Sequence, residues 1–257
     1  MEGQDKKFFK KFRKEGKIMF PKLLAEFLGT ATLILLGDGV VANVCLNKSG
    51  MKGGGPIQIT IAWGLAVLMP VICYGAISGA HFNPAVSIGL AIAGKFEWGL
   101  VVPYIIAQVL GGCFGGIVVY FFFKDQFDAT EDKGTKLGVF STGPSVKHTP
   151  VNFFCEVVGT FVLVYVILMN RDSGAATSGV ASLFTFGLIV SIGMSLGGTT
   201  GYAINPARDA GPRIAHMICF PKDPHNWEYG WIPVVAPIVG GCLAALLYLA
   251  VKAPFGL

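Results

Sequence analysis

The sequence contains 257 residues, of which 53% are hydrophobic and only 14% are charged. Because soluble domains carry about 25% charged residues, this composition excludes an ordinary soluble domain. The apolar residues are gathered into runs of about 20 residues, the length that a helix needs to cross a bilayer. The net charge of +5 does not indicate nucleic-acid binding, since the basic residues concentrate in residues 1–22 and no binding motif follows them. We therefore expect an integral membrane protein that binds no nucleic acid.

The N-terminal segment, residues 1–22, is rich in lysine, with phenylalanine side chains between the basic ones. Its simplest interpretation is a cytoplasmic flank that orients the first span, because positive charge is retained on the inner side of the membrane. A basic and aromatic helix lying on anionic lipid is compatible with that interpretation. A signal peptide is not expected, because the apolar segment that follows is long and contains Glu26.

Six apolar segments are predicted to span the membrane as helices. They are residues 23–45, 57–77, 100–122, 153–169, 180–196 and 231–251. Two shorter helices begin at Asn83 and Asn205, and the first of them ends near Ala93. At about 1.5 Å per residue, that first helix is too short to cross a hydrocarbon core about 30 Å thick. We expect both short helices to enter the membrane without crossing it.

The number of spans predicts how the chain is divided into regions and on which side of the membrane its termini lie. An even number of spans returns the chain to the side where it began, so both termini are predicted to be cytoplasmic in a multi-pass protein of the cell membrane. Residues 1–22 then form a basic cytoplasmic N-terminus, and residues 23–257 form a single membrane domain. Within that domain we expect a first repeat at residues 23–122, a polar extracellular loop at 123–150 and a second repeat at 151–252.

The two halves of the chain resemble each other. Ala25–Thr30 in the first span corresponds to Cys155–Thr160 in the fourth, and Gly111–Cys113 in the third corresponds to Gly240–Cys242 in the sixth. Three spans per copy is an odd number, so the second copy must cross the membrane in the opposite direction. We predict an all-α membrane protein with six transmembrane helices and two re-entrant half-helices in an inverted repeat. The half-helices would meet near the midplane by their N-termini.

Each short helix begins with the sequence Asn-Pro-Ala, at Asn83 and at Asn205. Asparagine is a preferred helix N-cap and proline suits the first helical position. If both asparagines are caps, backbone N–H groups hold each side-chain oxygen, and each NH₂ is free to donate into a path through the membrane. One such box is explained by a helix cap alone, whereas two in inverted positions indicate a path for neutral polar solutes.

The glycine-containing stretches before the two boxes are candidates for the acceptors of this path. Irregular backbone is tolerated at membrane depth only where it lines a cavity or is buried in protein. A polar solute that crosses hydrocarbon loses hydrogen bonds worth several kcal/mol, and backbone carbonyls would replace them. The residues expected to present these carbonyls are Gly79, Ala80 and His81 in the first repeat and Gly201, Tyr202 and Ala203 in the second.

Charged residues inside a membrane are costly, so they are functional by default. Arg208 follows the second box and is interpreted as a residue of the path, or as an arginine that reaches the outer interface. Glu26 and Glu156 allow two interpretations, a proton relay or a pair of structural carboxylates that accept N–H groups of the re-entrant loops. Their matching places in the two repeats favour the structural role.

The remaining ionisable residues predict no cofactor and no metal site. His81 is expected to face the path or to brace its loop, because no second metal ligand lies at a suitable spacing. Asp209 suits the positive end of the second short helix, and bracing Arg213 or the loop is an equally good interpretation. The six cysteines lie mostly in apolar spans and form no Cys-x-x-Cys pair, so we interpret them as small packing residues.

With paired Asn-Pro-Ala boxes in an inverted repeat, the chain resembles the aquaporin family over nearly its whole length. It is similar within that family to the aquaglyceroporins, or glycerol uptake facilitators, through Asn205–Asp209 and Gly211–Arg213. Tyr120, Asp209, Arg213, Pro237 and Ile238 match the residue types that separate glycerol channels from water-only channels. The resemblance implies that residues 23–257 are a single channel domain for passive passage of glycerol, water and other small neutral solutes. It also implies a homotetramer in the lipid bilayer, and no enzyme activity.

The resemblance further implies a constriction around Arg208. Trp63 and Tyr202 would offer apolar ring faces to the carbon backbone of a solute, and Arg208 would donate to its hydroxyls. Gly193 would leave room where water-selective relatives carry histidine. Some facilitators have phenylalanine at the position of Tyr202, so its hydroxyl bears on the range of solutes.

Three other functions remain as alternatives. A water-selective channel is disfavoured by Asp209, Gly193 and Pro237. A coupled secondary transporter shares the inverted repeat but needs a site for its coupling ion. A membrane enzyme would need a nucleophile and base or a metal site, and the sequence shows no such constellation.

Overall fold

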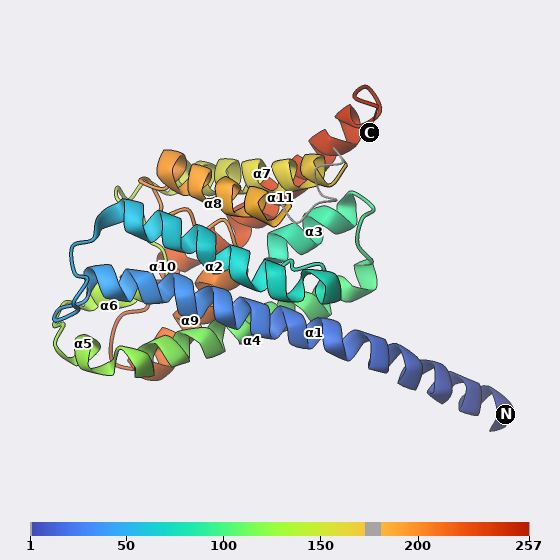
Figure 1. The fold of residues 1–257 in the computed structure, drawn as a ribbon, viewed down its shortest axis with the longest axis horizontal. Helices are drawn as coiled ribbons and strands as arrows, with labels where there is room; N and C mark the ends of the chain where they lie inside the picture. Colours follow the sequence, from blue (N-terminus) through green and yellow to red (C-terminus); the bar gives the residue numbers. More distant parts are fainter. Residues whose placement is uncertain (1, 173–180, 257) are drawn as a thin grey trace.

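A computed structural model describes residues 2–172 and 181–256, with the side chains of 19–171 and 182–256, and every regular element in these ranges is a helix. Figure 1 shows the long helices lying side by side in a bundle. Within the described residues, five helical segments are long and apolar enough to cross a membrane: Met19–Cys45, Gly55–Ser78, Trp98–Phe122, Thr149–Arg171 and Trp227–Val251. The first four lie in α1 (Glu2–Cys45), α2 (Gly55–Ser78), α4 (Trp98–Phe122) and α7 (Thr149–Asp172), and the fifth includes α11 (Ile232–Val251).

The remaining predicted span is α8 (Ala181–Leu196), which the structure describes over 16 residues. The predicted start of this span, Val180, lies outside the described residues. The short helices are α3 (Pro84–Ile92) and α9 (Pro206–Cys219), and in Figure 1 they lie toward opposite ends of the bundle. This arrangement agrees with the inverted repeat of the sequence.

The polar segments contain helices that the sequence analysis missed. The segment expected to be a loop after the third span contains α5 (Lys124–Asp128) and α6 (Lys133–Phe140), and α10 (Trp227–Gly230) precedes the last span. The side chain of Asp132 caps α6 by accepting the N–H of Thr135 at 2.6 Å. Hydrogen bonds from the Thr135 hydroxyl and N–H hold the pKa of Asp132 below its usual value.

The first span and the N-terminal segment form one helix. α1 runs for 44 residues with Pro21 inside it, and its first part extends away from the bundle in Figure 1. The same view places the start of α1 and the end of α11 at one end of the bundle, with α5 and α6 at the other. The two termini therefore lie on the same side, as an even number of spans requires.

Glycines let the first and third spans within each repeat approach each other closely. A Cβ at Gly111 of α4 would lie 2.3 Å from the carbonyl oxygen of Phe27, and one at Gly240 of α11 would lie 2.3 Å from that of Val157. Such contact between backbones is typical of small residues at membrane helix interfaces. These two close approaches, at matching positions, bring the first and third spans of each repeat together.

Each half-helix packs against the last span of the other repeat. A Cβ at Gly112 of α4 would lie 2.7 Å from the carbonyl oxygen of Ala207 in α9, and one at Gly241 of α11 would lie 2.8 Å from that of Ala85 in α3. Because α3 is held by the second repeat and α9 by the first, the two halves of the chain fix each other. Their N-termini are thereby brought to the centre of the protein.

Candidate functional site

The two asparagines that begin the half-helices are N-caps, as the sequence predicts. Oδ1 of Asn83 accepts the N–H of Ala85 at 2.9 Å. Oδ1 of Asn205 accepts the N–H groups of Ala207 at 3.0 Å and Arg208 at 3.2 Å. Both caps have extended backbone and are followed by proline, which is the local geometry that favours a helix start. Each amide nitrogen is thus turned away from its own helix.

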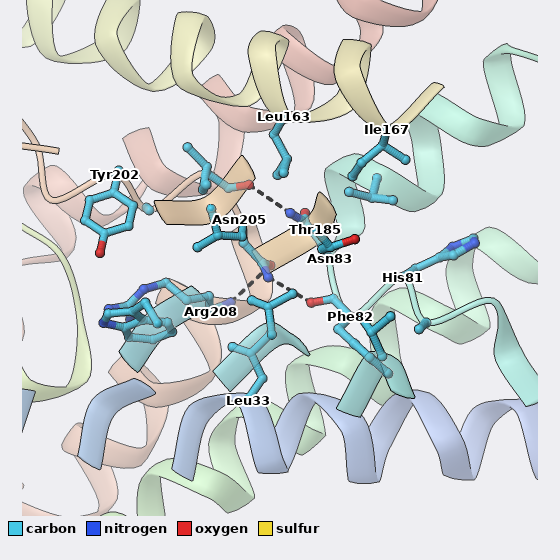
Figure 2. A pocket seen from close by; sticks show the side chains of 18 of the residues that line it. Leu33, His81, Phe82, Asn83, Leu163, Ile167, Thr185, Tyr202, Asn205 and Arg208 are labelled. Carbon is cyan, nitrogen blue, oxygen red and sulfur yellow. Dashed lines mark hydrogen bonds between the residues drawn. The ribbon is translucent and has the colours of Figure 1, made fainter. Parts of the chain in front are cut away.

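The amide groups of the two caps connect the two repeats. Nδ2 of Asn83 donates to the carbonyl oxygen of Ile204 at 2.8 Å, and Nδ2 of Asn205 donates to that of Phe82 at 2.8 Å, as the dashed lines in Figure 2 show. From the sequence, each NH₂ was expected to be free to donate into the path. One of them is used by the loop of the other repeat, because the two loops lie in contact where the half-helices meet. One hydrogen of each NH₂ remains for a solute.

The backbone before each cap adopts the same unusual conformation in both repeats. Ala80 and Phe82 have φ angles of 50° and 48°, and the matching residues Tyr202 and Ile204 have 39° and 42°. Left-handed conformations at non-glycine residues cost of order 1–3 kcal/mol each and persist only where surrounding contacts enforce them. The strain therefore points to a structure that holds both loops in place.

The two buried glutamates supply those contacts. Oε1 and Oε2 of Glu26 accept the N–H groups of His81 at 3.0 Å and Phe82 at 2.8 Å. Glu156 accepts those of Ala203 at 3.0 Å and Ile204 at 2.9 Å in the same way. Each carboxylate thus bonds two successive backbone N–H groups of a re-entrant loop, which is the geometry of the structural interpretation.

His81, in the loop before Asn83, makes further polar and aromatic contacts. Its Nδ1 lies 3.0 Å from Oγ of Ser87, and its ring centroid lies 4.5 Å from that of Phe96 and 5.2 Å from that of Tyr104. Gln108 of α4 donates to both Glu26, at 2.8 Å, and Ser87, at 3.1 Å. His81 both braces its loop and lines the cavity described below.

Arg208 is held on two sides by contacts from distant parts of the chain. Its guanidinium carbon lies 4.0 Å from the centroid of the Trp63 ring, and its Nη1 donates to Oδ1 of Asp38 and to the carbonyl of Phe140. Asp38 was missed by the sequence analysis. An acidic residue within a predicted span is itself the signal that would have found it. Among the described residues these are the hydrogen bonds of the guanidinium, so Nε and Nη2 remain for a solute.

Gly193 does not border the cavity, which differs from the expectation that it leaves room for a solute. A Cβ there would lie 2.6 Å from Cγ2 of Thr60 and 2.9 Å from Cζ of Tyr202, so the space beside Gly193 is filled by these side chains. The Tyr202 ring lines the cavity, while its hydroxyl oxygen is buried. Gly193 therefore makes room for Tyr202 and acts on the cavity through that ring.

Asp209 contacts both Arg213 and the loop after α6, the two partners that were equally possible from the sequence. Its Oδ1 accepts Nε of Arg213 at 2.8 Å and Nη2 at 2.7 Å. Its Oδ2 accepts the N–H and the hydroxyl of Thr142, each at 2.8 Å. Both side chains of the ion pair are fully buried, and together they fasten the segment after α6 to α9.

These elements enclose a cavity of about 260 Å³ that contains the two caps. Ten of the eleven predicted path residues border it: Trp63, Gly79, Ala80, His81, Asn83, Gly201, Tyr202, Ala203, Asn205 and Arg208. Figure 2 shows His81 toward one end of this row and Tyr202 with Arg208 toward the other. Other residues of the lining were not expected from the sequence. They are the polar residues Asn170 and Arg171 of α7 and Ser182 and Thr185 of α8, and an apolar wall of which Leu33 and Leu163 are part.

The cavity is therefore amphipathic along its length. The loops and half-helices contribute the two asparagine amides, the Arg208 guanidinium and backbone groups, whereas Leu33, Leu163 and Ile189 of the spans contribute apolar side chains. Among the described residues, no group of three or more histidine, cysteine or carboxylate side chains is placed to hold a metal ion. The arrangement offers hydrogen bonds on one side and a surface for C–H groups on the other.

Comparison with known proteins agrees with this geometry. The family model described as Major intrinsic protein matches residues 15–248. The "Glycerol uptake facilitator protein 3" of Lactiplantibacillus plantarum is 52% identical over 229 residues, which cover 88% of this chain and 95% of that protein. A "Probable glycerol uptake facilitator protein" of Thermotoga maritima is 51% identical over 227 residues, with 88% and 97% covered.

A solved structure extends the similarity to the fold. The X-ray structure of the aquaglyceroporin from Plasmodium falciparum matches with a TM-score of 0.83 and 32% sequence identity, covering 92% of this chain and 98% of that one. The two chains therefore share the helical fold described above. The chain therefore belongs to the major intrinsic protein family of multi-pass membrane channels, and it is not an enzyme.

Proposed function

We propose that the protein is a passive channel for glycerol and other small neutral solutes, together with water, across the cell membrane. The observation that carries this proposal is the pair of capped half-helices, which present one amide hydrogen each into a cavity with an apolar opposite wall. Glycerol has hydroxyls on one side of a carbon chain and C–H groups on the other. Its hydroxyls can therefore bond the donors while its C–H groups contact the apolar side chains. The names of the two bacterial relatives support the same solute.

The roles of the site residues follow from their positions. Asn83 and Asn205 donate to the solute at the centre, and Arg208 donates from Nε and Nη2 nearer one end. The rings of Trp63 and Tyr202 border the carbon chain of the solute. The loop carbonyls accept hydrogen bonds, so that a hydroxyl exchanges partners along the path rather than losing them. No cofactor takes part in this process.

The structural residues keep the path open. Glu26, Glu156 and Asp209 hold the two loops and α9 through the hydrogen bonds given above. A proton relay is the weaker interpretation of the glutamates, because both oxygens of each carboxylate are engaged by backbone N–H groups of a strained loop. A coupled transporter is therefore less well supported than a channel.

Assembly and orientation belong to the same proposal. We place both termini in the cytoplasm, because the lysine-rich segment before the first span follows the positive-inside rule and both termini lie at one end of the bundle. Homotetramer assembly in the bilayer is proposed from the family resemblance. Large apolar side chains such as Ile72, Phe114 and Leu246 are exposed on the outside of the spans, where lipid or another copy would cover them.

Stopped-flow light scattering on proteoliposomes tests the function. Vesicles containing the protein are mixed with a hyperosmotic solution of glycerol, urea or a larger sugar alcohol, and their reswelling is followed beside that of empty vesicles. We expect glycerol to enter rapidly and the larger solute to enter at the rate of empty vesicles. Rapid shrinkage by water efflux without glycerol entry would favour the water-selective alternative.

A further inference from the structure

A third carboxylate lies inside the spans, at Asp38 of α1. Its side chain is fully buried, and Oδ1 accepts Nη1 of Arg208 at 3.2 Å. Oδ2 is also buried and has no hydrogen-bond partner among the described residues. A buried charge that lacks other partners is retained in a membrane protein where it serves a function, and here the charge faces the arginine of the constriction.

The other buried acids near the path have different partners. Asp209 bonds Arg213 and Thr142 with its two oxygens. The two glutamates of the loops bond backbone N–H groups. Asp38 is therefore the acid that forms an ion pair with Arg208 among the described residues.

The charges along the path are otherwise positive. Two helix N-termini, each equivalent to about +0.5 elementary charge, meet at the centre, and the guanidinium of Arg208 adds a full charge at the constriction. Arg171 of α7 also borders the cavity. Positive potential opposes the entry of cations and protons, but it attracts anions. A negative charge close to the arginine offsets this attraction for small anions and leaves neutral solutes unaffected.

We propose that Asp38 is a selectivity residue that excludes small anions by neutralising Arg208. It also positions the guanidinium, because Asp38 and the carbonyl of Phe140 both take Nη1 and so leave Nε and Nη2 to the solute. This inference rests on the proposed function, since the path it describes is the glycerol path.

The test compares anion conductance and glycerol flux in the same protein preparations. Asp38→Asn keeps the shape of the side chain and removes its charge, and Asp38→Ser removes the charge with a smaller side chain. The double variant Asp38→Asn/Arg208→Gln restores a neutral constriction. Asp125→Asn serves as the control, because Asp125 is exposed on α5 and the substitution changes the net charge equally. Nitrate current is recorded under voltage clamp in planar bilayers, and glycerol entry by light scattering.

We expect nitrate conductance to rise at least about tenfold in both Asp38 variants, because removal of the negative charge beside Arg208 leaves the attraction of the guanidinium for anions uncompensated. The double variant should return to the low conductance of the wild type, and Asp125→Asn should not differ from it. Restoration by the second substitution is a result that a merely structural role of Asp38 would not give.

Unchanged nitrate conductance in both single variants would overturn the inference, and so would loss of glycerol entry in both without any nitrate current. A high conductance that persists in the double variant would also overturn it, since the charge of Arg208 would then not be the cause. If wild-type vesicles take up no glycerol, the proposed function fails. If they take it up while the Asp38 variants stay closed to nitrate, only the role of Asp38 fails.

Discussion

At the scale of single residues, the shape of the cavity near Arg208 depends on the Tyr202 ring and on the glycine behind it. The hydroxyl oxygen of Tyr202 is buried, so we expect Tyr202→Phe to leave glycerol flux at the wild-type level. Gly193→Ala places a methyl group 2.6 Å from Cγ2 of Thr60 and 2.9 Å from Cζ of Tyr202. Overpacking of this kind costs about 1–3 kcal/mol and shifts its neighbours. The ring is then pushed toward the cavity.

Light scattering can measure the narrowing of the cavity in Gly193→Ala. Entry of glycerol gives the glycerol permeability, shrinkage in an impermeant solute gives the water permeability, and their ratio is compared between variants. Gly193→Ala should lower the ratio, because the larger solute is excluded first as the cavity narrows. A lower ratio in Tyr202→Phe, with Gly193→Ala unchanged, would mean that the hydroxyl and not the ring position selects the solute.

A second prediction for single residues concerns the two helix caps, Asn83 and Asn205. Asn83→Ala and Asn205→Ala each remove a solute donor, a helix cap and a bond to the opposite loop, so we expect glycerol flux to fall in both. Loss of a cap also costs about 0.5–2 kcal/mol of stability. Asn152→Ala is the matched control, because Asn152 is buried and bonds His148 and Val146 at the start of α7. Wild-type flux in both cap variants, with both folded, would show that the caps are not part of the path.

At the scale of helices, close contact at glycines should determine stability. In Gly111→Ala the new Cβ would lie 2.3 Å from the carbonyl oxygen of Phe27, so α1 and α4 must separate. Gly99 lies on the same helix with nothing within 4 Å of an added Cβ. We expect Gly111→Ala to lower the midpoint of thermal unfolding in detergent and Gly99→Ala to leave it unchanged or slightly higher. Equal midpoints for the two variants would contradict the packing described for α4.

Features that depend on short stretches of chain could be predicted from the sequence at this scale. The spans follow from apolar runs, and the caps follow from Asn-Pro at Asn83 and Asn205, because each depends on neighbours in the chain. The use of one amide hydrogen by the opposite loop could not be foreseen, since Asn83 and Ile204 are 121 residues apart. The pairing of Asp38 with Arg208, 170 residues apart, likewise exists only in the folded protein. The short helices α5 and α6 were missed because their apolar residues Phe127 and Phe140 are buried by tertiary contacts.

At the scale of the whole molecule, the two repeats hold each other at the centre of the protein, where the half-helices meet. α3 packs on α11 and α9 packs on α4, while each cap bonds the loop of the other repeat. Both buried glutamates are engaged by the strained loops that they hold. Transport by such a structure follows the gradient of the solute alone.

Uptake of radiolabelled glycerol into proteoliposomes, followed to its plateau with and without imposed proton or sodium gradients, tests this claim most directly. We expect the protein to speed the approach to the plateau over empty vesicles, and the internal glycerol concentration to end equal to the external one under every gradient. A plateau above the external concentration when a proton or sodium gradient is imposed would contradict a passive channel and would identify a coupled transporter.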